Sequence, residues 1–253
     1  MADDTAPGKN LAFGIDIGGS GVKGAVVDLD TGEFVGERFR VETPDPSTPD
    51  LIADAVREVV DHFSWTGPVG LTVPGVVVNG VVRSVGNIDQ SWVGTDTQKL
   101  FGDALGDRRI AVLNDADAAG LAELRYGDER ARTGLVILLT FGTGIGSALL
   151  YNGVLVPNSE LGHLELNGKI VERSASAKAK TDHDWGYPKW SKKVSKVLLH
   201  FERVLTPDLF IVGGGISKEA DKWVPHLTNA MPVVPARLRN TAGIVGAAMA
   251  VNL

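Results

Sequence analysis

The stretch "FGIDIGGSGVKGAVVDLDTG", residues 13–32, decides how this chain folds. Apolar, β-branched segments at 11–17 and 22–29 predict two antiparallel strands, and a turn at 31–32 leads into a third. The first two strands are joined by a tip that carries several glycines. Because glycine has no Cβ, backbone N–H groups at such a tip can approach an anion closely. A simpler alternative is that the glycines only form a hairpin turn.

The same pattern returns in the second half of the chain. "GLVILLTFGTGIGSALLYNGVLV", residues 134–156, again reads as strand, glycine-rich tip and strand, and "DLFIVGGGIS", residues 208–217, ends a late strand in a third glycine cluster. A repeated unit of this kind predicts an α/β fold with two domains of similar topology around a cleft. We expect an N-terminal domain at 1–117, joined by a C-terminal helix at 241–253, and a C-terminal domain at 118–240.

The composition excludes several classes of function. The 253 residues carry a net charge of −6, so the chain is not expected to bind nucleic acid or a membrane surface in general. It contains no cysteine, which rules out disulfides, thiolate nucleophiles and cysteine-ligated zinc. The N-terminal "MADDTAPGKN" is polar and acidic rather than a signal sequence, and no apolar run approaches the roughly 18 residues of a membrane span. We therefore expect a cytoplasmic protein.

Three glycine clusters at strand ends together favour phosphate binding over simple turns. Neither a Walker A loop nor a strand–GxGxxG–helix unit is present. A carboxylate at Asp16 would repel phosphate unless a cation lay between them, which predicts Mg²⁺ held by Asp16 directly or through water, whereas the alternative role is a turn cap. The predicted phosphate or nucleotide contacts are Gly18, Gly19, Ser20, Lys23, Thr140, Gly142, Thr143, Gly144, Gly213, Gly214 and Gly215.

Five motifs together resemble one known family. "DIGGSGVKG", "LNDADAAGLAE", "TFGTGIG", "ELGHLEL" and "VGGGIS" are similar to motifs of the ROK family of sugar kinases, in the actin-like ATPase superfamily, and the match extends over residues 11–250. The resemblance implies two actin-like ATPase (ribonuclease H-like) domains hinged around a cleft. It also implies phosphate loops at the back of the cleft, sugar between the domains, and a homodimer.

Sugar phosphorylation needs a group that accepts the hydroxyl proton, and Asp115 in "LND" is the best candidate. The resemblance implies the same catalytic role, although Asn114, Asp115 and Asp117 are all suited to cap a helix. The resemblance further implies sugar contacts through polar side chains that can each take adjacent hydroxyls. The predicted sugar-binding residues are Asn87, Asn114, Asp115, Glu160, His163 and Glu172.

One departure from the family concerns zinc. Many members carry a cysteine-rich zinc site between the matching histidine and the second glutamate, whereas here that gap is only "LELNGKIV". We therefore expect no zinc, and His163 must be oriented in another way. This departure also weakens the assignment of Glu172. Without the motif "ELGHLEL", we would interpret His163 as a structural histidine.

A basic segment interrupts the otherwise acidic chain. Residues 169–203 hold nine Lys or Arg against four Asp or Glu, whereas residues 1–168 hold 12 against 24. Read as a helix from Pro188, the segment places cations in a stripe beside an apolar face, which is either a solvated surface or a path for a polyanion. The predicted polyphosphate path is Lys178, Lys180, Lys189, Lys193, Lys196 and Arg203.

This segment and "SWVGTD", residues 91–96, resemble the polyphosphate-using glucokinases and glucomannokinases within the family. The resemblance implies transfer of the terminal phosphate of inorganic polyphosphate, and of ATP, to the 6-hydroxyl of glucose, with mannose open as a second acceptor. Three alternatives remain: a strictly ATP-dependent hexose kinase, a polyphosphate phosphatase, and a sugar-responsive repressor. The repressors carry a DNA-binding domain before the first strand, where only about ten residues stand here.

Overall fold

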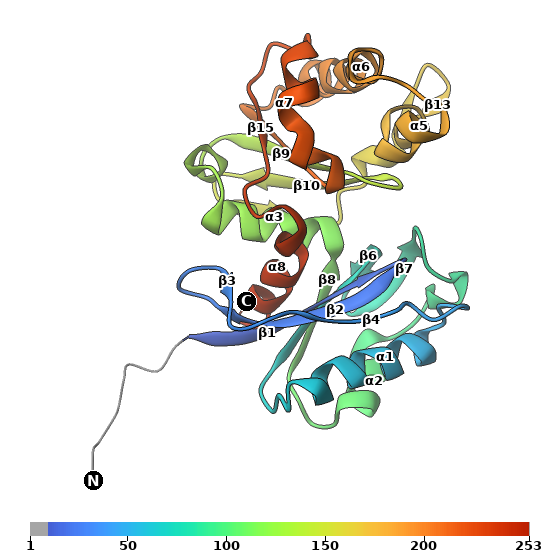
Figure 1. Cartoon of the computed structure of the whole chain (residues 1–253), viewed down its shortest axis with the longest axis vertical. Helices are drawn as coiled ribbons and strands as arrows, with labels where there is room; N and C mark the ends of the chain where they lie inside the picture. The colour runs from blue at the N-terminus through green and yellow to red at the C-terminus, as the bar shows by residue number, and fades with distance from the viewer. Residues whose placement is uncertain (1–9, 253) are drawn as a thin grey trace. The chain divides into compact units, whose positions relative to one another are not determined.

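The computed structural model describes residues 10–252 of the chain. By its contacts the chain divides into unit 1, Met1–Leu113 with Gly243–Leu253, and unit 2, Asn114–Ala242 (Figure 1). The sequence-based boundary at residue 117 would leave Asn114 and Asp115 in the first domain. They belong to unit 2 because the helix that begins at Asp115 packs on the sheet of that unit.

Unit 1 is built on a six-stranded sheet in the order β3-β2-β1-β5-β8, with β4 paired to β2. Helices α1 and α2 cover one face of this sheet, and α8 covers the other (Figure 1). Its elements are β1 (Leu11–Gly18), β2 (Gly21–Asp28), β3 (Glu33–Phe34), β4 (Phe39–Val41), α1 (Pro49–His62), β5 (Val69–Val73), β6 (Gly75–Val78), β7 (Val81–Val85), the 3₁₀ turn η1 (Gln90–Trp92), α2 (Thr97–Leu105), β8 (Ile110–Asn114, whose last residue belongs to unit 2) and α8 (Ala242–Ala250, whose first residue belongs to unit 2).

The two strands predicted from residues 13–32 are present, but the predicted third strand is broken in two. β1 and β2 pair in antiparallel register, with Asp16 opposite Lys23 and Gly18 opposite Gly21. Gly36 adopts φ 86°, which a strand residue does not, so the chain turns between β3 and β4. As a result β3 pairs with the end of β2, and β4 pairs with its start.

The C-terminal helix α8 returns to unit 1 and packs directly on its sheet. A Cβ on Gly14 would lie 1.9 Å from the Ile244 carbonyl oxygen, and one on Gly70 would lie 1.7 Å from that of Ala247. Only glycine therefore allows the backbone of α8 to approach β1 and β5 this closely.

Unit 2 is built on a five-stranded sheet in the order β11-β10-β9-β14-β15. Helix α3 packs on β9 and β10, while α6 and α7 lie over the other face, around a core that contains Phe141, Trp190 and Trp223 (Figure 1). Its elements are α3 (Asp115–Tyr126), η2 (Glu129–Arg132), β9 (Leu135–Phe141), β10 (Ile145–Tyr151), β11 (Val154–Val156), η3 (Leu161–His163), β12 (Glu165–Leu166), β13 (Lys169–Ile170), α4 (Val171–Ala175), α5 (Ala177–Asp182), α6 (Tyr187–Leu205), β14 (Leu209–Gly213), η4 (Gly215–Glu219), α7 (Ala220–Trp223), η5 (Val224–His226), β15 (Val233–Pro235) and η6 (Arg239–Thr241).

The long helix α6 confirms the helix predicted from Pro188. Its apolar positions fall on one buried face, including Val194, Leu198 and Phe201, because residues three and four apart share a face of a helix. Among the described residues, no helix is both long and apolar enough to cross a membrane.

Candidate active site

The first glycine tip, residues 18–20 between β1 and β2, has a carboxylate and an ammonium group at its base. Lys23 Nζ lies 3.9 Å from Asp16 Oδ2, and each side chain is 24% exposed. The Thr72 hydroxyl donates a hydrogen bond of 3.0 Å to Asp16 Oδ1, which fixes the carboxylate. The partial exposure leaves both charged groups within reach of a ligand.

Two further residues of unit 1 lie at this tip. Arg40 is paired with Lys23 across β2 and β4, and its guanidinium donates to the Ser20 carbonyl. Asn87 lies beside Gly19, since a Cβ on this glycine would be 3.1 Å from the Asn87 carbonyl oxygen. The structure thus places the predicted sugar contact Asn87 next to the first tip, and it adds Arg40, which our sequence analysis missed.

The first turn of α3 carries the predicted base. Asn114 is the N-cap, and its side-chain oxygen accepts hydrogen bonds from the N–H groups of Ala116 (2.8 Å) and Asp117 (3.0 Å). Asp115 is half-buried, and its Oδ1 accepts from the Ala116 N–H at 2.8 Å. Asn114 therefore caps the helix, as the alternative interpretation expected. Asp115 is the half-buried carboxylate of this turn.

The second glycine tip, residues 142–144 between β9 and β10, is attached to its surroundings. The Gly142 carbonyl accepts a 3.0 Å hydrogen bond from the N–H of Lys178, in the first turn of α5. Gly142 and Thr143 are exposed at the tip. The N-terminal end of α5 and the tip are therefore joined through the backbone.

The third glycine cluster lies against the base of this second tip. Gly213 is paired with Thr140 in the parallel ladder of β14 and β9. Gly214 adopts φ 81°, and a Cβ there would lie 2.3 Å from the Phe141 carbonyl oxygen. The structure therefore brings the predicted phosphate contacts of unit 2 together at one edge of its sheet.

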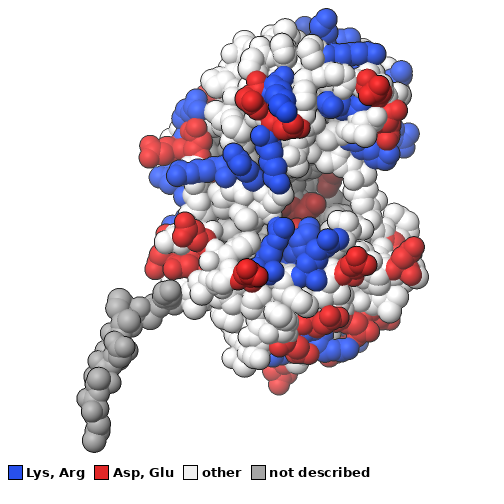
Figure 2. All heavy atoms as spheres, in the orientation of Figure 1, with Lys and Arg blue, Asp and Glu red and all other residues white. Residues whose placement is uncertain are grey.

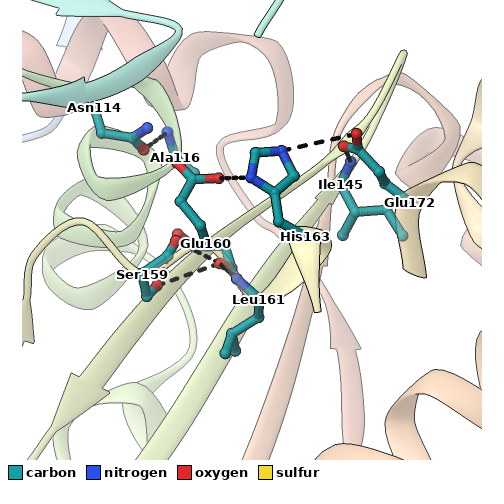
Figure 3. A network of polar contacts seen from close by, with 9 residues as sticks. Asn114, Ala116, Ile145, Ser159, Glu160, Leu161, His163 and Glu172 are labelled. Atoms are coloured by element: carbon teal, nitrogen blue, oxygen red, sulfur yellow. Dashed lines mark hydrogen bonds and ion pairs between the residues drawn. The ribbon is translucent and has the colours of Figure 1, made fainter. Parts of the chain in front are cut away.

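Three of the predicted sugar-binding residues of unit 2, Glu160, His163 and Glu172, form a connected group (Figure 3). The His163 ring lies between two carboxylates, with Nδ1 3.5 Å from Glu160 Oε2 and Nε2 3.8 Å from Glu172 Oε1. Glu172 Oε2 also accepts a 3.3 Å hydrogen bond from the N–H of Ile145, the residue after the second tip. These contacts supply the orientation of His163, and they join the group to the glycine tip.

Burial changes the acidity of two carboxyl groups in this region. It raises the pKa of Glu160, an effect that His163 partly offsets and Glu172 reinforces. Burial raises the pKa of Asp117 to about 6, the N–H of Asn158 opposes the rise, and repulsion from Glu160 adds to it. From the sequence, Asp117 was predicted only as a possible cap, and its burial was not predicted.

Lysine and arginine side chains are spread over the part of unit 2 that contains α5 and α6 (Figure 2). The ammonium groups of Lys189 and Lys193 lie 5.5 and 5.2 Å from the centroid of the Trp185 ring, and that of Lys180 lies 4.5 Å from the Tyr187 ring. Such cation–π contacts hold the side chains over one surface. Lys196 and Arg203 are exposed farther along α6.

One predicted path residue has part of its charge compensated within the protein. The Lys178 ammonium lies 2.6 Å from Asp182 Oδ2 on the same helix. Because both side chains are more than half exposed, this pair is weak and a stronger anion can displace it.

A cavity of about 590 Å³ lies beside η4, which follows the third glycine cluster. Its walls combine basic residues (Lys218, Arg237, Arg239), acidic residues (Asp128, Asp221) and apolar residues such as Val234 and Ala236. Apolar walls with a few charged groups are typical of small-molecule sites.

The donor set at Asp16 fits Mg²⁺ in one respect. Asp16 provides a partly exposed carboxylate, and Mg²⁺ in phosphoryl-transfer sites is typically bound by one or two carboxylates, with waters and substrate phosphates as the other ligands. Among residues 10–252, no group of three or more His, Cys, Asp or Glu side chains is placed to hold a metal ion.

Comparison with known proteins shows the family to which this chain is similar. A family model described as ROK family matches residues 12–175. The polyphosphate glucokinase of Mycobacterium tuberculosis (strain ATCC 25618 / H37Rv) is 58% identical over 238 residues, which cover 94% of this chain and 90% of that protein.

Two solved structures extend the comparison. The inorganic polyphosphate/ATP-glucomannokinase from Arthrobacter sp. strain KM is 49% identical, with a TM-score of 0.91 over 96% of this chain and 98% of that one. A ROK family glucokinase from Streptomyces griseus, solved with glucose and AMPPNP, is 24% identical with a TM-score of 0.79 over 95% of this chain and 98% of that one, and bears on the fold alone. These likenesses confirm the expected α/β fold of two actin-like ATPase domains.

Proposed function

This chain belongs to the ROK family, and we propose that it is a phosphotransferase that moves the terminal phosphate of inorganic polyphosphate to the 6-hydroxyl of glucose. The relatives named for this activity are 58% and 49% identical over nearly the whole chain. ATP serves as a second donor in the proposal, since the Arthrobacter enzyme is named for both donors. Mannose is proposed as an alternative acceptor because the Arthrobacter enzyme is named a glucomannokinase.

One observation carries the proposal from the side of the structure. Glu172 faces His163 and also accepts the N–H of Ile145 at the end of the second glycine tip. A group of side chains suited to sugar hydroxyls is therefore joined directly to a tip suited to phosphate. Such a junction is what direct transfer between the two substrates requires.

In the proposed reaction, Asp115 accepts the proton of the sugar 6-hydroxyl as the hydroxyl oxygen attacks the terminal phosphorus. The terminal phosphoanhydride bond breaks, and the shortened polyphosphate (or ADP, when ATP is the donor) leaves with its electron pair. Glu160, His163 and Glu172 hold the ring hydroxyls. The bare amides of residues 142–144 donate to the phosphate oxygens, where negative charge must be stabilised in the transition state. Water is excluded when the sugar is bound, which prevents loss of the phosphate to hydrolysis.

The contributions of unit 1 to this reaction are proposed from its residues and from the resemblance. The first glycine tip would donate amides to the phosphate chain, and Lys23 with Arg40 would supply positive charge. Mg²⁺ held at Asp16 would neutralise charge on the phosphates. A homodimer and a cytoplasmic location likewise remain predictions.

The donor path is proposed along α5 and α6. Five of the six predicted cations, all but Lys178, have no carboxylate in an ion pair among the described residues. A row of four ammonium groups and one guanidinium without such partners suits a polyanion with one charge on every phosphate. ATP would instead use the cavity of about 590 Å³ beside η4.

A donor exchange tests the proposal. Glucose 6-phosphate is measured with glucose and either polyphosphate or ATP, and phosphate release is measured without sugar. We expect glucose-dependent product from polyphosphate. Product from ATP alone would favour a strictly ATP-dependent hexose kinase, and phosphate release that needs no sugar would favour a polyphosphate phosphatase.

A further inference from the structure

We propose that Asp117, together with Ser147, is a positioning residue for the sugar site: the two buried side chains hold the segment 158–161 so that Glu160 faces the hexose. The inference rests on the proposed function, because it assigns Glu160 to sugar binding. It adds a residue that touches neither substrate and acts through the backbone of this segment.

Asp117 lies in the first turn of α3, two residues after Asp115. Its side chain is 1% exposed, and its Oδ2 accepts a 2.7 Å hydrogen bond from the N–H of Asn158. Asn158 adopts φ 60°, so the chain turns sharply where this bond is made. The same helical turn therefore presents Asp115 and fixes the start of the segment that contains Glu160.

Ser147 on β10 holds the other side of this segment, and it is also 1% exposed. Its hydroxyl donates to the Ser159 carbonyl at 2.7 Å and accepts from the Leu161 N–H at 2.9 Å. The contacts to Ser159 and Leu161 lie immediately before and after Glu160 (Figure 3). Glu160 is thus fixed by backbone hydrogen bonds to buried groups on both sides.

The other carboxylate oxygen of Asp117 indicates that this arrangement is costly. Asp117 Oδ1 is buried without a hydrogen-bond partner among the described residues. A buried carboxylate oxygen left in this state lowers stability, and burial with repulsion from Glu160 raises the pKa of Asp117 to about 6.

Glu123 provides a matched control on the same helix. It is also 1% exposed, and it accepts hydrogen bonds from the N–H groups of Arg237 (3.0 Å) and Leu238 (2.7 Å). Both acidic residues therefore use α3 to hold a distant loop. Of these two acidic residues, Asp117 is the one that holds the loop containing Glu160.

The test compares the variants Asp117→Ala, Asp117→Asn, Ser147→Ala and Glu123→Gln with polyphosphate as the donor. Asp117→Ala and Ser147→Ala should each raise the KM for glucose about tenfold, while kcat and the KM for polyphosphate change less than threefold. Asp117→Asn keeps an acceptor oxygen and should restore most of the glucose KM. Glu123→Gln should lower the melting temperature and leave the glucose KM unchanged.

Three outcomes would overturn the inference. The first is a glucose KM within twofold of wild type in a folded Asp117→Ala. The second, which decides the matter if that variant does not fold, is an unchanged glucose KM in Ser147→Ala. The third is a rise in the glucose KM of Glu123→Gln as large as the rise in Asp117→Ala. Glucose affinity is also measured by calorimetry without donor. This measurement tests the positioning of Glu160 even if no phosphate is transferred, so failure of this inference can be told apart from failure of the proposed function.

Discussion

The two glycine tips share one strand topology but are supported in different ways. The first tip, on β1 and β2, has the Asp16–Lys23 pair at its base and Arg40 on the adjacent strand. The second tip, on β9 and β10, is joined to Glu172 through Ile145 and to α5 through Gly142. A repeated backbone unit therefore carries charge in one copy and connections to the side chains proposed to bind sugar in the other.

This difference teaches that similar backbones need not make equal contributions. A glycine-rich turn alone supplies amides, whereas the groups packed around it decide which chemistry it supports. We expect changes around the second tip to affect both sugar and donor.

The strongest test removes the proposed base of unit 2. Asp115→Asn should lower kcat by about 10²- to 10⁴-fold, because an amide cannot accept the sugar proton. Glucose affinity measured by calorimetry should change little, since the amide keeps the size and the acceptor oxygen. Near-normal turnover of Asp115→Asn would show that Asp115 is not the base. Asp103→Asn, on exposed α2, serves as the control.

The next prediction concerns the basic surface connected with the second tip through α5. Charge reversal of Lys193 and Lys196 should reduce kcat/KM for polyphosphate by roughly tenfold or more, and for ATP less than threefold. The loss should shrink as salt is added, because screening weakens exposed charge interactions. Equal losses with both donors would instead indicate a solvated helix face without a role in donor binding. Reversal of Lys99, which pairs with Asp103 in unit 1, is the matched control.

A smaller effect is expected from one methyl group at the second tip. A Cβ on Gly144 would lie 2.3 Å from Glu172 Oε2, whereas one on Gly142 would meet nothing within 4 Å. Gly144→Ala should therefore raise the KM values for glucose and for the donor together, each about five- to tenfold. Gly142→Ala, and Gly18→Ala at the first tip, should change the glucose KM less than twofold. A rise confined to the donor KM in Gly144→Ala would show that the two sites are not joined as proposed.

The smallest effect is a pH dependence of stability. Burial raises the pKa of Asp117 to about 6 and also raises those of Glu123 and Glu160. The folded state then keeps protons that the unfolded chain releases near pH 4, so this stabilisation is present below pH 4 and is lost as the pH rises through about 6.

For Asp117 the loss is on the order of 2–3 kcal/mol between pH 4 and 7.5. The melting temperature of the wild type relative to Asp117→Asn should therefore fall by a few degrees from pH 5 to pH 7.5. Thermal unfolding of both proteins at several pH values measures this difference. A difference in melting temperature between the two proteins that does not change with pH would contradict the raised pKa of Asp117.

The strands around both tips could be predicted because apolar, β-branched runs end in glycines whose spacing is visible in the sequence. The break between β3 and β4 could not, because it depends on the left-handed conformation of Gly36. Arg40 was missed for a related reason: it reaches the first tip only because β4 pairs with β2 beside Lys23. The pairing of short strands is decided by tertiary contacts rather than by local pattern.

Asp117 shows a second limit of prediction from the sequence. In "LNDADAAG" it reads as one of three acidic or amide residues at a helix start, and all three suit a cap. Its partner Asn158 lies 41 residues away, so no local pattern connects them. Glu160, His163 and Glu172 could be proposed because the motifs carry them, whereas their contacts with each other required the fold.

The hydrogen bond from Lys178 to Gly142 has a consequence for engineering. Residues 145–177 form a closed loop between the glycine turn and the start of α5, and this loop contains Glu160, His163 and Glu172, the side chains proposed to hold the ring hydroxyls. A designer who changes the length of this loop to accommodate a bulkier acceptor would have to keep the hydrogen bond between Lys178 and Gly142, because α5 carries two of the lysines proposed for the donor, Lys178 and Lys180. Selectivity for the two substrates is therefore hard to redesign one at a time in this scaffold.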